Sequence, residues 1–246
     1  MTILRDLFQA VSFLTVVPVP HAKSNSLAKS MIFFPLVGFG IGWVSLGFYF
    51  FLLKIFPESI ACLALLAVPV ILTGGLHVDG FADFCDGFFG GRTREDILRI
   101  MKDSRIGAFG GLGLVFLMLG KYEFLKILPR PEIFFPFALA AGRGAQVLFS
   151  FSLPYAGLEG GLGASTASKV GIRELLGAGL TLGILAFLSG PAAWVSLLSL
   201  LPLWAGFGFF YQRKIGGVTG DLLGAASEMT ELWVLASAAA LAGGFS

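Results

Sequence analysis

Long uncharged stretches divide the chain at intervals that suit membrane helices. Residues 30–53 form 24 consecutive positions without Asp, Glu, Lys or Arg, residues 59–78 form 20, and residues 175–212 form 38. About 20 apolar helical residues cross the hydrocarbon core of a bilayer. Proline is unfavourable inside a helix, so Gly190-Pro191 divides the longest stretch into two helices. The three stretches therefore predict four transmembrane helices.

Three further apolar stretches predict spans that contain charges. They run from residue 106 past residue 121, over residues 133–153, and from residue 222 to the C-terminus; their charged positions are Lys121, Arg143, and Glu228 with Glu231. The segment 7–19 is apolar but too short to cross, so we expect a re-entrant or interfacial piece. The chain as a whole is predicted to be an all-α integral membrane protein with about seven transmembrane helices, in a single polytopic domain over residues 1–246.

Composition supports the membrane interpretation. Hydrophobic residues make up 56% of the chain and charged residues 13%, whereas soluble domains carry about 25% charged residues. Two cysteines are too few for a disulfide framework. The net charge of +2 provides no overall basic field, so no nucleic-acid partner is expected.

The basic residues indicate an orientation. With the N-terminus in the cytoplasm, twelve Lys and Arg residues fall in cytoplasmic segments and four outside, with Lys121 counted among the four. After the second span, Thr93 and Asp96 form a capping signal ahead of an apolar stripe at Ile97, Ile100 and Met101. This segment predicts a short interfacial amphipathic helix.

Clustered acidic residues are the strongest chemical signal. Asp79, Asp83 and Asp86 are spaced i, i+4 and i+7, which places them within about 60° of one another on a helix. A single Asp at the bilayer centre costs roughly 2.5–3.5 kcal/mol, so three on one face need a cation or an aqueous cavity. Oxygen ligands of this kind favour Mg²⁺, which keeps waters and binds substrate phosphates.

A second acidic group follows a glycine-rich loop at the other end of the chain. Asp221 and Glu228 are again seven residues apart. Four spans separate this loop from the one after His77, so both groups face the same side and a shared site is allowed. His77 lies on the face opposite the three aspartates, where it could act as an acid, base or donor if the glycines break the helix.

Basic residues complement these carboxylates. Lys102 and Arg105 follow the acidic group and could hold phosphate oxygens or anchor the chain at the membrane surface. Arg143 lies between two glycines in the middle of a span. An intramembrane Arg of this kind indicates a functional site, with a carboxylate or bound phosphate as its partner.

These motifs resemble the cobalamin synthase family, the adenosylcobinamide-GDP ribazoletransferases. The resemblance covers nearly the whole chain; its strings are residues 12–20, Phe34-Pro35-Leu36, and residues 74–87, 101–107 and 216–225. It implies a multi-pass enzyme of the cytoplasmic (inner) membrane whose active site faces the cytoplasm. The implied reaction joins adenosylcobinamide-GDP with alpha-ribazole, or its 5'-phosphate, to give adenosylcobalamin or its phosphate, with release of GMP.

The resemblance, taken with the residue chemistry, assigns roles to positions of this chain. The partners are corrinoid and nucleoside substrates and the lipid bilayer, with a homo-oligomer or association with other late enzymes of the pathway left open. The cofactor is Mg²⁺. The expected metal ligands are Asp79, Asp83, Asp86 and Asp221; the catalytic candidates are Glu228, as general base, and His77; the substrate-binding candidates are Lys102, Ser104, Arg105, Arg143, Thr219 and Gly220.

Two alternatives remain at this stage. A CDP-alcohol phosphotransferase uses similar chemistry, but its Asp-x-x-Asp-Gly-x-x-Ala-Arg pattern would need an Arg where this chain has Asp83. A secondary transporter would carry ionisable residues near mid-membrane on broken helices in related halves. Arg143 alone fits that description, and no internal repeat is visible.

Overall fold

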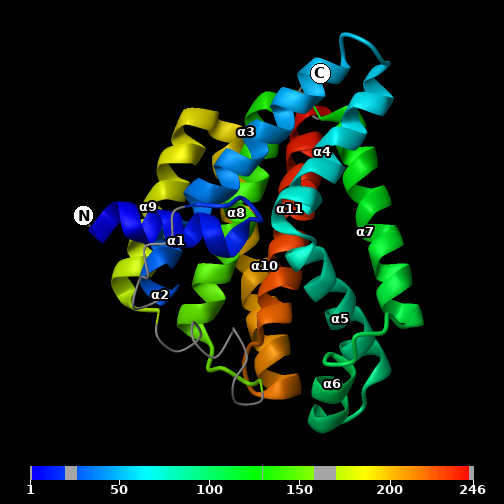
Figure 1. The fold of residues 1–246 in the computed structure, drawn as a ribbon, viewed down its shortest axis with the longest axis vertical. Helices are drawn as coiled ribbons and strands as arrows, with labels where there is room; N and C mark the ends of the chain where they lie inside the picture. Colours follow the sequence, from blue (N-terminus) through cyan, green and yellow to red (C-terminus); the bar gives the residue numbers. More distant parts are fainter. Residues whose placement is uncertain (1, 20–26, 129, 158–169, 244–246) are drawn as a thin grey trace.

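The structure is a computed structural model that describes residues 2–19, 27–128, 130–157 and 170–243, and in these ranges every named element is a helix (Figure 1). The elements are α1 (Thr2–Leu14), α2 (Leu27–Ser30), the 3-10 helix η1 (Met31–Phe33), α3 (Phe34–Leu52), α4 (Glu58–Thr73), α5 (Leu76–Gly90), α6 (Arg94–Ile100), α7 (Ala108–Ile127), α8 (Pro131–Ser152), α9 (Ile172–Ser189), α10 (Pro191–Ile215) and α11 (Gly220–Gly243). The all-α prediction is confirmed.

Five helical segments in the described residues are long and apolar enough to cross a membrane: Leu27–Leu52, α7, α8, α9 and α10. The pair α4 and α5 meets the same test as one broken span, which raises the number to six. The prediction of about seven spans is therefore not confirmed by length and hydropathy. The predicted last span corresponds to α11, a 24-residue helix whose first half carries Asp221, Glu228 and Glu231, and these charges lower its hydropathy.

The predicted second span is broken at a glycine pair. Gly74 and Gly75 both adopt the left-handed conformation, with φ of +61° and +76°, which glycine populates without steric cost. The axes of α4 and α5 consequently meet at 92°. Because of this bend, the acidic residues of α5 turn back towards the bundle.

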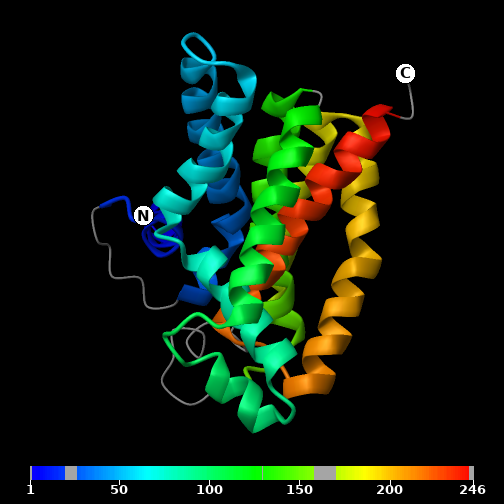
Figure 2. The same cartoon turned by 90° about the vertical axis from the view of Figure 1, so that its right-hand side faces the viewer.

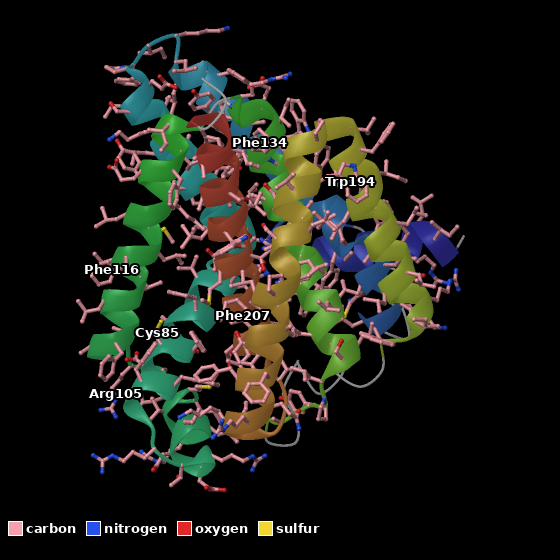
Figure 3. The ribbon with its side chains drawn as sticks, turned by 180° about the vertical axis from the view of Figure 1, so that it is seen from behind. Cys85, Arg105, Phe116, Phe134, Trp194 and Phe207 are labelled. Carbon is pink, nitrogen blue, oxygen red and sulfur yellow. The ribbon has the colours of Figure 1, made fainter. Side chains whose placement is uncertain are left out.

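Helices α8 and α11 form the centre of the bundle. Helix α8 is buried along most of its length between α3 and α11, and α11 also packs against α5, α7 and α10. Large apolar side chains on the outer helices point away from the bundle, as Phe116 of α7 does in Figure 3. These exposed apolar surfaces suit lipid, and the chain is a multi-pass membrane protein.

Helices α1 and α6 are shorter than the membrane-spanning helices and pack against α3 and α5, respectively. Helix α1 lies across the long axis of the bundle, as the two perpendicular views show (Figures 1 and 2). Helix α6 begins at the predicted cap, where the Thr93 side chain accepts a hydrogen bond from the Asp96 amide at 3.1 Å. Arg94 donates from Nε to the Ile215 carbonyl at 2.8 Å. That bond joins α6 to the end of α10, and the predicted interfacial location of α6 is not confirmed.

Candidate active site

Asp221 of the second acidic group lies where α5 crosses α11, whereas Glu228 does not. A Cβ on Gly80 would lie 2.7 Å from the Asp221 carbonyl oxygen, and one on Gly224 would lie 3.2 Å from the His77 Cα. Larger side chains would push the helices apart, so these two glycines permit the close approach. The crossing brings Asp221 beside the first turns of α5, as the shared-site prediction requires.

A pairing between two loops fixes the start of α11. Val218 N donates to the Pro154 carbonyl at 2.9 Å, and Ala156 N donates to the Val218 carbonyl at 3.0 Å. Thr219 then caps the helix, because its hydroxyl accepts from the Leu222 amide at 3.3 Å. Asp221 is held in the first turn, and Tyr155 is brought to the same place. Burial raises the pKa of the Tyr155 phenol, and the charge of Asp221 adds to this effect.

Two adjoining cavities surround this crossing. The first has a volume of about 530 Å³ and is lined by Ser12, Phe13, Met31, Phe34, Leu76, His77, Asp79, Leu98, Met101, Lys102, Gln146, Tyr155, Gly157, Thr219, Gly220, Asp221, Leu223 and Gly224. The second, about 860 Å³ and more open, is lined by residues of α1, α4, α5, α7 and the α6–α7 loop, among them Asp83, Ser104 and Arg105. Asp79 and Lys102 line both cavities and therefore mark their junction.

Three of the four predicted metal ligands line these cavities. Asp79 is exposed, Asp83 is half-buried, and Asp221 faces the first cavity. The negative charges of Asp221, Asp79 and Asp86 all act on Asp83. Carboxylates this close repel one another unless a cation or a proton compensates them.

Asp86 has a different environment. Its two carboxylate oxygens accept hydrogen bonds from the backbone amides of Gly107 at 2.7 Å and Gly110 at 2.8 Å. These amides belong to the first turn of α7, whose N–H groups lack helical partners. Asp86 is buried and caps that helix, and each of its carboxylate oxygens already accepts one hydrogen bond from the protein.

The carboxylates at the crossing suit only a partly hydrated Mg²⁺ ion. Among the described residues, no three His, Cys, Asp or Glu side chains are grouped closely enough to hold a metal ion by themselves. Mg²⁺ is usually bound through one or two carboxylates, with waters and substrate phosphates completing its shell. The hard oxygen donors of Asp79, Asp83 and Asp221 fit such an ion, whereas a dehydrated, all-protein site does not fit.

The predicted phosphate-binding residues lie around the second cavity. Lys102, Ser104 and Arg105 line it, and Arg105 extends at the α6 end of the bundle (Figure 3). The Arg105 guanidinium donates to Asp103 at 2.8 and 3.0 Å, which lowers the pKa of Asp103 to about 2. Two of the Arg105 donors are therefore already bound to Asp103. Lys102, by contrast, lines both cavities.

His77 lines the first cavity and is 2% exposed. Its Nδ1 atom is buried and lacks a hydrogen-bond partner among the described residues. The bend at Gly74 and Gly75 sets the direction of the first turn of α5, in which His77 lines the cavity. Phe13, Gln146 and Tyr155 also line this cavity and were missed as site residues from sequence. A glutamine within a predicted span was a signal for Gln146, whereas only the loop pairing positions Tyr155.

A separate cluster of buried charges crosses the bundle beyond the first cavity. Lys121 of α7 lies 2.6 Å from Glu228 and 2.7 Å from Glu231, both on α11. Arg143 of α8 lies 2.8 Å from the other Glu231 oxygen and donates to Ser227. All four charged side chains are at most 8% exposed. Two cations and two anions thus balance within the bundle.

This cluster changes the interpretation of three sequence predictions. Lys121 does not lie in an outer segment, as the orientation count assumed, because it points from α7 into the core. Arg143 has a carboxylate partner, as predicted, but lines neither of the two large cavities, and the same is true of Glu228. The sequence did contain a signal for this cluster. Glu228 and Glu231 lie three residues apart in one predicted span, and two other predicted spans each carry one basic residue, Lys121 and Arg143.

Comparison with known proteins identifies the family. The family model of cobalamin-5-phosphate synthase matches residues 6–239. The chain belongs to this family. The match includes every carboxylate of the α5–α11 crossing, as well as the buried charge cluster.

Curated relatives of the family align over nearly their whole length. The adenosylcobinamide-GDP ribazoletransferase of Chlorobaculum tepidum is 41% identical, with 95% of each chain covered. The protein of the same name from Chlorobium phaeobacteroides is 42% identical over 97% of this chain and 99% of its own, and that from Klebsiella pneumoniae is 38% identical over 94% and 98%. No solved structure gives a significant match. These relatives do not favour the phospholipid-enzyme or transporter alternatives.

Proposed function

We propose that the chain is an adenosylcobinamide-GDP ribazoletransferase, which joins adenosylcobinamide-GDP and alpha-ribazole or its 5'-phosphate and releases GMP. Family membership supports the reaction. The observation that carries the site is the α5–α11 crossing, which brings Asp221 of the first cavity close to α5, where Asp79 and Lys102 line both cavities at their junction. A junction of two cavities lets two substrates meet at their reacting groups.

The transfer makes one bond and breaks one. A ribose hydroxyl oxygen bonds to the phosphorus attached to cobinamide, the anhydride bond from that phosphorus to GMP breaks, and GMP leaves with the bonding electrons. Positioning the hydroxyl in line with that bond is a large part of the catalysis. The residues at the junction hold the phosphates, and Lys102 offsets the negative charge that develops on the leaving group.

The hydroxyl proton needs an acceptor in the first cavity. His77 has a buried ring nitrogen without a partner among the described residues and lines that cavity, whereas the Glu228 carboxylate is bound by Lys121 at 2.6 Å. We therefore assign the general-base role to His77 and a structural role to Glu228. This assignment differs from the expectation drawn from sequence, and the difference rests on where the folded chain places each group.

Mg²⁺ is proposed as the cofactor, held by one or two of the carboxylates of Asp79, Asp83 and Asp221, with waters and substrate phosphates completing its shell. When bound, it would neutralise phosphate charge and so assist departure of GMP. Asp86 is assigned to capping α7. Thr219 and Gly220 shape the cavity at the start of α11, and Ser104 and Arg105 belong to the phosphate side.

We further propose seven spans, with the N-terminus and the active site on the cytoplasmic side of the cell membrane. The pair α4 and α5 would be one broken span and α11 the seventh. Removing Lys121 from the outer set leaves three basic residues there against twelve, so the charge bias that supports this orientation becomes stronger.

The function is tested by incubating the purified protein in detergent micelles with GDP-cobinamide and alpha-ribazole, and measuring GMP and the corrinoid product together. We expect equal amounts of both, loss of activity with a chelator, and recovery with Mg²⁺. A folded protein that releases no GMP would refute the proposed function.

The shared metal is tested with Asp79→Ala, Asp221→Ala and the double variant, titrated with Mg²⁺ under single-turnover conditions. If both carboxylates hold one ion, the double variant loses little beyond either single variant. Losses that multiply, or an unchanged Mg²⁺ midpoint in Asp221→Ala, would contradict a shared metal.

A further inference from the structure

We infer that the two cavities divide the substrates: the 530 Å³ cavity is the site for the aromatic-base nucleoside, and the open 860 Å³ cavity receives the nucleotide-activated corrinoid. This inference rests on the proposed function and assigns each substrate to one cavity. It follows from the volume of each cavity and the side chains that line it.

The walls of the first cavity match an apolar bicyclic base. Phe34 lines this cavity alone, and its ring is stacked on that of Phe13, which borders both cavities; the ring centroids are 5.8 Å apart and the planes 15° apart. Leu98 and Leu223 add apolar surface. Aromatic and aliphatic walls favour an aromatic ring with few polar groups, and 530 Å³ falls within the range of cavities that enclose small ligands.

The polar groups of the first cavity point to the nucleophile. His77 and Gln146 line this cavity and offer polar atoms to a ribose. Asp79 and Asp221 stand at the same cavity. A nucleoside with its base between the apolar walls would therefore direct its ribose towards the carboxylates, where the phosphate of the other substrate arrives.

The second cavity suits the larger, anionic substrate. A corrin macrocycle is too large to be enclosed with its nucleotide, so it needs the more open space. Lys102, Ser104 and Arg105 provide one ammonium, one hydroxyl and one guanidinium along that space, beside the carboxylates of Asp79, Asp83 and Asp103. Ammonium and guanidinium groups bind phosphate oxygens, and Arg105 divides its donors between such a phosphate and Asp103. Lys102 lines both cavities, which suits a diphosphate held at the junction.

A matched pair of serine variants tests this division. Ser12 lines the first cavity but not the second, and Ser104 lines the second but not the first; neither side chain is fully buried. Ser12→Trp should raise the KM for alpha-ribazole by about tenfold or more, because a tryptophan would overfill the cavity and a loss of about 1.4 kcal/mol of binding free energy corresponds to that factor. The KM for GDP-cobinamide should stay within about twofold. Ser104→Trp should show the reverse.

Direct binding separates failure of this inference from failure of the proposed function. Alpha-ribazole alone is titrated into the wild-type protein and both variants, and its heat of binding is measured without the second substrate. Binding that is lost in Ser12→Trp and kept in Ser104→Trp supports the division even if no GMP is released. Binding that is absent in all three proteins, equal in all three, or lost only in Ser104→Trp would overturn it, as would variants that raise both KM values equally.

Discussion

Removing one member of the buried charge cluster should destabilise the protein far more than removing two that balance. Lys121 Nζ contacts Glu228 at 2.6 Å and Glu231 at 2.7 Å, and Arg143 contacts Glu231 at 2.8 Å. The wild-type cluster is neutral. Lys121→Met gives the cluster a net charge of −1 and leaves Glu228 without a cationic partner. Glu228→Gln gives the cluster a net charge of +1.

The magnitude follows from the burial of these groups. Leaving one charge of a buried pair uncompensated costs about 3–5 kcal/mol, and one carboxylate or ammonium at membrane depth costs roughly 2.5–3.5 kcal/mol. We therefore expect each single variant to lose about 3 kcal/mol of unfolding free energy. The double variant Lys121→Met/Glu228→Gln keeps Arg143 paired with Glu231 and stays neutral, so it should be more stable than either single variant.

The measurement is a double-mutant cycle on the detergent-solubilised protein, with unfolding in SDS mixed micelles followed by circular dichroism. Arg99→Met is the control, because Arg99 is 73% exposed and pairs with Asp96 on the surface at 3.2 Å; no measurable change is expected there. Additive losses in the double variant, or single variants as stable as wild type, would refute the charge-balance reasoning. Transferase activity in the stable double variant would in addition support the structural role of Glu228.

Three further predictions concern the active site and the orientation. Asp83→Asn should fold normally and lose transferase activity, whereas Glu95→Gln, an exposed control on α6, should keep both; wild-type turnover in Asp83→Asn would exclude a metal role. Asp86→Ala should lower the unfolding free energy by about 2–3 kcal/mol, because two α7 amides lose a charged acceptor, and unchanged stability in chemical denaturation would argue against the capping role. Cysteines introduced at Lys214 and at Arg130 should react with an impermeant thiol reagent from opposite sides of the membrane, and labelling from one side would contradict the proposed orientation.

Sequence alone determined the class of the protein and indicated its family. A chain with uncharged stretches of 20 or more residues must satisfy its backbone within helices when it lies in lipid, so the pattern fixed an all-α membrane bundle. The spacing of Asp79, Asp83 and Asp86 placed them on one side of a helix. The motifs were specific enough to indicate the family, because their residue types and separations are set by local chemistry.

Only the tertiary structure decided which of these groups act together. The bend at Gly74-Gly75 and the crossing at Gly80 and Gly224 bring α5 onto α11, a contact between segments about 140 residues apart that no local pattern encodes. The same packing turns Glu228 towards Lys121 and away from the two large cavities. A carboxylate on a helix has the same local sequence whether it faces a substrate or a buried cation, and the choice depends on which neighbouring helix covers its face.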